Sequence, residues 1–393
     1  MNILILFSHR WRGGRAGGAE TYTIQLSRGL AARGHSVTLA TEKVDPASGA
    51  KTTNEVDPVE PGKPTTGITV DYELPFQTIN PFKKRNVHCQ IDKIAADRHI
   101  DIVHAQHRTA GYFAHRLWRN KRVPYVVTVH DPWHATPFKK WHGRLFRHVI
   151  AVSDFLRQLL IRDFHVPPER VTTIRNGVDP TRFAGITREQ GASLRTEYGI
   201  GPNEVVLSQV SRISRAKGQH DLIEALASLP RTLNCRCLIF GEGKDRPRLE
   251  RLVAKHGLER KVLFCGFRAD IPAVFAATDV MVLPSHREGL PLAVVEAMLS
   301  NVAVIAARTA GVPEIITYGE DGLMFEAGDL PALASHIEKL VTDAELRHRL
   351  AAAGRKTAES RFLVSRVLDE TEAYYREIVA QASAGVENSG VEN

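Results

Sequence analysis

The sequence predicts an α/β protein with two doubly wound parallel sheets in series, each forming a Rossmann-like domain. Three observations predict this fold. The chain has 393 residues, more than one hydrophobic core usually organises. Short apolar runs alternate with helical patterns, which is typical of βαβ units and a parallel sheet. The alternation restarts after a polar stretch at about residues 184–203, so we expect a second sheet there.

The first half supplies the first sheet. The opening run, residues 1–8, has no basic start and is too short for a signal peptide or a membrane span, so we expect a buried strand of a cytoplasmic protein. A stretch rich in Pro, Thr, Gly and Lys at 43–67 predicts a long loop. The predicted strands are Ile3–Phe7, Ser36–Ala40, Ile102–His104, Tyr125–Val129 and His148–Val152, with helical stretches such as Ala19–Ala32 between them.

The second half repeats this pattern. Its predicted strands are Val205–Val210, Cys237–Phe240, Val262–Phe264, Val280–Leu283 and Val302–Ala306. The predicted domains are therefore 1–183 and 203–362, joined by a linker at 184–202. A helical pattern at 363–382 carries the adjacent Tyr374 and Tyr375, and we expect the repetitive tail 383–393 to be disordered.

Composition and charge fit an ordinary globular protein, with 43% hydrophobic and 24% charged residues. The four cysteines are scattered and form no Cys-x-x-Cys pair, which favours a reducing cytosol over a disulfide framework.

The charge is unevenly distributed along the chain. Residues 1–190 hold 28 Lys and Arg against 17 Asp and Glu, whereas residues 191–393 hold 24 against 27. The basic front half would attract an anionic partner such as a phospholipid surface; a generally basic protein with no such partner is the alternative.

The strongest functional signal is the segment Glu288–Glu296, which follows a predicted strand. Pro291 suits the first turn of a helix over about 291–300, whose free N–H groups would form an anion site. Glu288 lies just before this helix and Glu296 about a turn and a half inside it. Carboxylates beside a phosphate site suit sugar hydroxyls, because each accepts hydrogen bonds that hydroxyls donate. A solvated helix face is the alternative for two glutamates considered alone.

A second signal, residues 212–218, follows the strand Val205–Val210. Arg212 and Lys217 would lie at the carboxyl end of a parallel strand, where open α/β sheets bind ligands, and they could neutralise a leaving diphosphate. The spaced glycines of a Walker loop are missing, and an exposed basic turn is the alternative. Gly241 and Gly243 end another strand and would let the backbone approach a ligand closely.

A glycine-rich segment, residues 13–18, follows the first strand and precedes a helix. It lacks the Gly-x-Gly-x-x-Gly order of a dinucleotide fingerprint, which argues against a dehydrogenase. Its N–H groups could still bind a phosphate or a sugar. A purely structural tight turn is the alternative.

Histidines gather near the ends of two strands in the first half. The spacing of His104, His107, His130 and His134 suggests zinc, but no clear tetrahedral set emerges and we predict no metal. His130 follows a central strand, where it would face a ligand cleft and hydrogen-bond a donor sugar or an acceptor. A buried histidine with satisfied hydrogen bonds is the alternative.

Together these motifs resemble glycosyltransferase family 4, the retaining group 1 enzymes with the GT-B fold. The resemblance covers residues 1 to about 380. It rests on Arg212 with Lys217-Gly218, Gly241-Glu-Gly243, Gly266-Phe-Arg-Ala-Asp270, Leu283-Pro-Ser285, the Glu-x7-Glu element, Gly311-Val-Pro-Glu314 and, in the first half, Gly17-Gly-Ala-Glu20, Val129-His-Asp131 and Asn176-Gly-Val-Asp179. One departure is Asn301-Val-Ala303, where the family often has Gly-x-Pro. Asn tolerates a left-handed helix cap, so we expect this turn to survive.

The resemblance implies two Rossmann-like domains facing across a cleft, with the helix 363–382 returning to the first domain. It implies Arg212 and Lys217 on the diphosphate of a sugar nucleotide, Glu296 on the ribose, and Glu288 with the backbone after it on the transferred sugar. Gly17 and Gly18 would cap the diphosphate, and His130 would lie against the sugar. The implied catalytic residues are His130, Arg212, Lys217 and Glu288, and the donor site adds Gly17, Gly18, Gly241, Gly243, Phe267, Gly289, Leu290, Pro291, Leu292 and Glu296.

The implied reaction retains anomeric configuration by departure and attack on the same face, with no cofactor and no metal. The donor would be a UDP-, GDP- or ADP-linked sugar. The acceptor would be a glycan or a lipid-linked molecule, in the synthesis of a bacterial-type surface polysaccharide or glycolipid. The alternatives are a nucleotide-sugar epimerase, a glycoside phosphorylase, and a non-catalytic module that binds sugar nucleotides or lipids.

Basic residues crowd the region Arg108–Arg147, with Trp118, Trp133 and Trp141 among them. Basic and Trp side chains are both favoured at an anionic bilayer, so we hypothesise peripheral contact with the inner face of the cell membrane. A solvated basic face is the alternative. Aromatic residues are too thinly interleaved to indicate nucleic-acid binding, which we do not expect.

Overall fold

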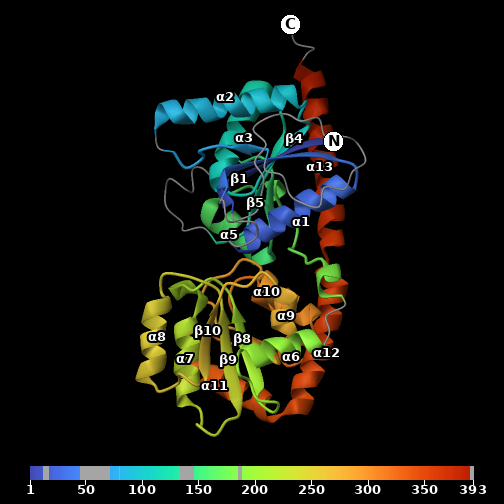
Figure 1. The fold of residues 1–393 in the computed structure, drawn as a ribbon. Coiled ribbons are helices and arrows are strands. Elements are labelled where there is room, and N and C mark those ends of the chain that lie inside the picture. The colour runs from blue at the N-terminus through green and yellow to red at the C-terminus, as the bar shows by residue number, and fades with distance from the viewer. Residues whose placement is uncertain (12–16, 45–70, 79, 133–145, 185–187, 390–393) are drawn as a thin grey trace. The chain divides into compact units, whose positions relative to one another are not determined.

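A computed structural model of the chain describes residues 1–11, 17–44, 71–78, 80–132, 146–184 and 188–389 (Figure 1). Most of the predicted loop 43–67 lies outside these residues, as do His134, Trp133 and Trp141. The chain divides into two compact units. Unit 1 comprises Met1–Asn176 together with Val364–Asn393, and unit 2 comprises Gly177–Leu363.

Unit 1 contains a seven-stranded parallel sheet in the order β3-β2-β1-β4-β5-β6-β7. The apolar runs predict it because strands covered by helices on both faces are apolar along their length, and Ile3 to Leu6 are fully buried. The strands are β1 (Asn2–Trp11), β2 (Ser36–Val44), β3 (Tyr72–Glu73), β4 (Ile102–Ala105), β5 (Tyr125–Val129), β6 (Val149–Ala151) and β7 (Val171–Thr173). The helices are α1 (Gly18–Ala32), α2 (Pro81–Asp97), α3 (Arg108–Lys121), α5 (Asp154–Phe164), the 3-10 turn η2 (Pro168–Arg170) and α13 (Val364–Ser389).

Unit 2 contains a six-stranded parallel sheet in the order β10-β9-β8-β11-β12-β13, with helices on both sides of it (Figure 1). The strands are β8 (Val205–Val210), β9 (Cys235–Phe240), β10 (Val262–Gly266), β11 (Val280–Leu283), β12 (Ala303–Ala307) and β13 (Leu323–Phe325). The helices are α6 (Arg188–Glu197), α7 (Gln219–Ser228), α8 (Arg246–Lys255), α9 (Ile271–Ala276), α10 (Leu292–Leu299), α11 (Leu330–Thr342) and α12 (Ala344–Arg361). The short 3-10 turns are η3 (Pro180–Phe183), η4 (Arg215–Lys217) and η5 (Val312–Glu314).

The structure differs from the sequence prediction at the segment 184–202, which we expected to be a linker. This segment carries α6, which packs on α9 within unit 2. A Cβ atom at Gly191 would lie 2.3 Å from the carbonyl oxygen of Ala276. The glycine that favours a linker in the sequence therefore permits close helix packing.

The unit boundaries also differ from the predicted ones. Unit 1 ends at Asn176 rather than at residue 183, and α13 continues to Ser389, past the predicted helix end at 382. α13 contributes Val367, Leu368 and Tyr375 to the apolar core of unit 1. Its contact with α1 is close, because a Cβ atom at Gly29 would lie 2.3 Å from Leu368. The last helix is thus part of the unit 1 core.

Candidate functional site

The candidate site of unit 2 lies at the carboxyl ends of β8 and β11. These strands are neighbours in the middle of the sheet, and the next strands along the chain, β9 and β12, lie on opposite sides of them. The loops after β8 and β11 therefore diverge, which is the topological switch point where open α/β sheets bind ligands. The first loop carries Arg212 and Lys217, and the second carries Glu288.

The structure brings Lys217 and Glu288 together. The Lys217 Nζ atom lies 2.7 Å from Glu288 Oε1, although 71 positions separate the two residues in the sequence. Glu288 is buried, with 5% of its surface exposed. The two loops are joined by a backbone hydrogen bond in which the His286 amide donates to the Ala216 carbonyl, at 2.9 Å. A charged pair at this position gives the site both a cation and a carboxylate.

The backbone around Lys217 is fixed from two sides. The Gln209 side chain of β8 donates a 2.7 Å hydrogen bond from Nε2 to the Lys217 carbonyl. Gly218 has a positive φ of 68°, and a Cβ atom there would lie 1.9 Å from the Pro284 carbonyl oxygen. Glycine is the residue that fits both conditions. Gln209 was not among the predicted site residues, although a polar residue inside a buried strand is a signal that could have identified it.

Arg212 presents an available cation in the same loop. Its side chain is exposed and makes no hydrogen bond or ion pair with the residues that the structure describes. Its backbone is held by Gln219, whose Nε2 atom donates a 3.2 Å hydrogen bond to the Arg212 carbonyl. The loop is therefore ordered while the guanidinium group stays free to bind an anion.

Gly241 and Gly243 hold the loop after β9 against the loop that carries Arg212. Cβ atoms at these positions would lie 2.0 Å from the Ser211 carbonyl oxygen and 1.8 Å from the Ile213 carbonyl oxygen. The sequence predicts a close backbone approach here. The approach that the structure shows is to the neighbouring loop, and contact with a donor stays a prediction. Phe267, which follows β10, is 41% exposed.

The helix α10 begins directly after Pro291, close to the predicted start. Residues Gly289 and Leu290 lead into it, and the Gly289 carbonyl accepts a 3.0 Å hydrogen bond from the Gly311 amide. Within the part of the chain that the structure describes, no side chain caps α10. The Val294 amide donates a 3.2 Å hydrogen bond to the Pro291 carbonyl, so the amides of Leu292 and Ala293 are the ones left for an anion.

The left-handed cap predicted at the other end of α10 is confirmed. Asn301 has a positive φ of 58°. The family's glycine is thus replaced at this position without loss of the turn.

Glu296, inside α10, is also buried. Its Oε1 atom accepts a 3.1 Å hydrogen bond from Arg182 Nη1. Burial raises the pKa of the Glu296 carboxyl, and the charge and hydrogen bond of Arg182 oppose that rise. Arg182 was not among the predicted site residues, because 114 positions separate it from Glu296 in the sequence.

In unit 1, Gly17 and Gly18 form the start of α1. Gly17 has a φ of 128° and its carbonyl accepts hydrogen bonds from the Glu20 and Thr21 amides, at 3.1 and 3.2 Å. Among the described residues, no atom lies within 4 Å of the Cβ position at Gly17, so its positive φ requires glycine. None of the described side chains caps α1.

His130 follows β5 and is buried, with 7% of its surface exposed. Its Nε2 atom lies 2.9 Å from Gln106 Oε1, so Nε2 carries the proton and Nδ1 is the acceptor. Nδ1 has no hydrogen-bond partner among the described residues. Burial is the main cause that lowers the pKa of His130 to about 4, with Asp131 opposing it and His9 adding to it. The imidazole is therefore neutral at pH 7.

The neighbouring described histidines, His104 and His107, contact other side chains of unit 1. His104 is buried between Tyr375 and Thr128, with its ring nitrogens 2.5 Å and 2.6 Å from the two hydroxyl groups. His107 packs against the ring of His130, with 5.6 Å between centroids. Across the described residues, no group of three or more His, Cys, Asp or Glu side chains is arranged to hold a metal ion.

Comparison with known proteins decides the family. The family described as "Glycosyltransferase Family 4" matches residues 16–182, and "Glycosyl transferases group 1" matches residues 192–357. The putative glycosyltransferase EpsD of Bacillus subtilis is 31% identical over 322 residues, covering 77% of this chain and 84% of EpsD. The alpha-D-kanosaminyltransferase of Streptomyces kanamyceticus is 30% identical over 288 residues, covering 68% of this chain and 74% of that enzyme.

The chain is a family 4 glycosyltransferase.

This glycosyltransferase has the GT-B fold. Anabaena HepE, solved with UDP and glucose, superposes with a TM-score of 0.80 at 23% identity, covering 96% of this chain and 100% of HepE. No helix in the described ranges is long and apolar enough to cross a membrane.

Proposed function

We propose that this glycosyltransferase moves a sugar from a nucleotide-diphosphate donor to a glycan or lipid-linked acceptor, with retention of configuration and without a bound metal. The observation that carries the proposal is the grouping of Arg212, Lys217, Glu288 and the uncapped start of α10 at the β8/β11 switch point. Positive groups beside a buried carboxylate suit a ligand that joins a diphosphate to a sugar.

The cations would act on the leaving group. Negative charge grows on the diphosphate as the bond to the sugar breaks, so cations placed beforehand stabilise the transition state more than the ground state. Lys217, Arg212 and the first amides of α10 supply this stabilisation. In our proposal they take the place of a divalent metal. Unchanged turnover after EDTA treatment supports metal independence, and loss that Mg²⁺ or Mn²⁺ restores contradicts it.

Hydrogen-bond acceptors of the protein would hold the transferred sugar. The Glu288 carboxylate accepts hydrogen bonds from sugar hydroxyls, and the backbone of Gly289, Leu290, Pro291 and Leu292 follows it in the donor site. The family resemblance adds the neutral His130, whose free Nδ1 atom can accept another hydroxyl. Glu296 would take the ribose hydroxyls, and Gly17 and Gly18 would offer amides to the diphosphate. No nucleophile is assigned, so we propose departure and attack on one face of the sugar.

A thermal-shift panel with UDP, GDP and ADP tests the proposal. A ligand that binds only the folded protein raises the melting temperature. HepE is solved with UDP, so we expect UDP to give the largest shift. If none of the three nucleotides changes the melting temperature at millimolar concentration, the proposed donor class is wrong.

A second proposal concerns the acceptor and location. Arg116, Arg119, Lys121 and Arg122 are exposed on and just after α3, which favours docking on the anionic inner face of the cell membrane, where a lipid-linked acceptor would be presented. Trp118 stacks with Arg122 and Arg147, whose Cζ atoms lie 5.2 Å and 4.3 Å from its ring centroid. Charge rather than this Trp would therefore dominate docking.

Co-sedimentation with vesicles tests membrane contact. We expect binding to vesicles containing phosphatidylglycerol at low salt, weaker binding to neutral vesicles, and loss of binding at high salt. Equal binding to both kinds of vesicle would contradict docking through this basic face. Membrane contact would favour a role in surface polysaccharide or glycolipid synthesis.

A further inference from the structure

The segment Asn176–Asp179 is a family motif with no part in the mechanism above. Its residues lie where the chain enters unit 2. The Val178 amide donates a 2.8 Å hydrogen bond to the Phe362 carbonyl. The Asp179 carboxylate accepts hydrogen bonds from the amide and the hydroxyl of Thr181, at 2.9 and 2.7 Å. These bonds fix both the position and the start of the turn η3.

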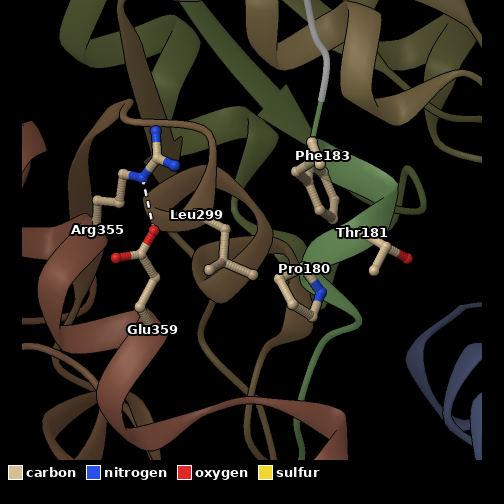
Figure 2. Close-up of a pocket in the computed structure, with 7 residues that line it drawn as sticks. Pro180, Thr181, Phe183, Leu299, Arg355 and Glu359 are labelled. Carbon is tan, nitrogen blue, oxygen red and sulfur yellow. Dashed lines mark hydrogen bonds and ion pairs between the residues drawn. The ribbon is translucent and has the colours of Figure 1, made fainter.

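The turn η3 carries Arg182 to α10. The guanidinium group lies over the Phe183 ring, 5.4 Å from its centroid, and its Nη1 atom reaches Glu296 Oε1. Phe183 is buried, with 9% exposure. In Figure 2, Pro180, Thr181 and Phe183 of this turn line a hollow together with Leu299 of α10. Arg182 therefore contacts Glu296 from a turn that is anchored by the buried Phe183 side chain.

The contact matters because Glu296 is buried. An ionised carboxylate accepts hydrogen bonds from hydroxyl groups on both oxygens and more strongly than the protonated acid does, and burial disfavours the ionised form. A single guanidinium partner on Oε1 supports the charge and restricts rotation of the carboxylate. Arg182 is the partner that the described structure gives Glu296.

We propose that Arg182 is a positioning residue for the donor ribose, holding the Glu296 carboxylate charged and oriented so that it accepts the two ribose hydroxyls. This inference rests on the proposed sugar-nucleotide donor. It gives the Asn176–Asp179 motif a function, because Asp179 forms the turn from which Arg182 extends. Arg182 itself need not touch the nucleotide.

A comparison of ribose and dideoxyribose nucleotides tests the role. Titration calorimetry would measure UDP, GDP and ADP and their 2′,3′-dideoxy forms, taking the base that binds the wild-type protein most tightly. We expect the wild-type protein to prefer the ribose form by at least about tenfold, since hydrogen bonds to a buried carboxylate are lost with the hydroxyls. In Arg182→Gln we expect that preference to fall to about threefold or less, with little change for the dideoxy form.

The controls separate positioning from folding. Arg182→Lys keeps a cation and should recover most of the preference. Arg355→Ala removes an exposed ion pair with Glu359, 2.8 Å long, on the other wall of the same hollow (Figure 2), and should leave the preference unchanged. The Glu296→Gln variant should lose the preference, and adding Arg182→Gln to it should cost no further ribose affinity.

The outcomes are distinct. Arg182→Gln could weaken binding of the ribose and dideoxyribose nucleotides equally, or it could keep the wild-type preference for ribose. Either result would mean that Arg182 only links η3 to α10 and that the inference is wrong. If Arg182→Gln does not fold, a wild-type preference in Glu296→Gln overturns the inference instead. If the wild-type protein binds no nucleoside diphosphate, both the proposed function and this inference fall.

Discussion

The Lys217 ammonium group and the buried Glu288 carboxylate form an ion pair 2.7 Å long between the loops after β8 and β11. The pair places the cation that we expect to bind the leaving diphosphate in direct contact with the carboxylate that we expect to bind the sugar hydroxyls. Each side chain thereby holds the other in position before a donor arrives, which reduces the ordering required on binding. Loss of either should affect turnover more than fold.

Lys217→Ala should lower kcat at least tenfold. Its ammonium group would stabilise the charge that grows on the departing diphosphate, an interaction strongest in the transition state. Steady-state kinetics with the best donor measures the change. Lys244→Ala, which removes an exposed lysine from a neighbouring loop, should retain wild-type turnover. Near-wild-type kcat in Lys217→Ala would show that the diphosphate assignment is wrong.

Gly218→Ala should destabilise the protein by about 3 kcal/mol or more, because strain at positive φ adds to a clash with backbone. Gly199→Ala is a matched control, since Gly199 has a φ of 61° with no atom of the described residues within 4 Å of its Cβ position. It should cost only about 1 kcal/mol. Urea denaturation followed by circular dichroism compares the two variants, and equal losses would contradict the close approach of Gly218 to Pro284.

Stability should fall on acidification because of His130. Its pKa is about 4 in the folded protein, below the ordinary value of 6.5, so between these values the unfolded chain binds a proton that the native protein does not. The free energy of unfolding is unaffected by this difference above pH 6.5. As the pH falls from 6.5 to 4, it decreases by roughly 3 kcal/mol. Melting curves from pH 7 to pH 4 should show a smaller decline for His130→Gln. Replacement of the exposed His348 by Gln should leave the decline unchanged.

Tyr375→Phe should cost about 1–3 kcal/mol of stability, because it leaves the buried His104 ring nitrogen without its partner on α13. Equilibrium denaturation measures the loss. Tyr318→Phe, at a side chain that is 52% exposed, should have almost no effect. An unchanged stability in Tyr375→Phe would mean that the hydrogen bond to His104 does not help to hold α13.

The strands and the local motifs were predictable because each depends on neighbouring residues. Runs such as Val280–Leu283 are apolar along their length, and Glu288 and Glu296 share one short segment. The strand β7 was missed because its three residues, Val-Thr-Thr, include two polar side chains. The segment 184–202 was assigned wrongly because Gly191 and its polar neighbours indicate a linker when the packing partner α9 is unknown.

The candidate site was predictable as a set of residues but not as a set of contacts. The sequence places Arg212 and Lys217 after one strand and Glu288 after another, and the parallel topology brings their loops to one edge. The pairing of Glu296 with Arg182 depends on where the chain enters unit 2, which no local pattern reveals. A carboxylate at a buried position of an apolar helix indicates that a cationic or hydrogen-bonding partner lies nearby, but it does not identify that partner.

The divided chain of unit 1 has a consequence for biosynthesis. Unit 2 is contiguous, from Gly177 to Leu363, whereas unit 1 needs α13, which follows unit 2 in the sequence. On the ribosome, unit 2 can therefore complete its core first, while unit 1 must wait until α13 has been synthesised. Premature termination before Val364 would leave Tyr22 and Leu26 without the apolar surface of α13, producing a nascent chain with one finished lobe and one prone to aggregation.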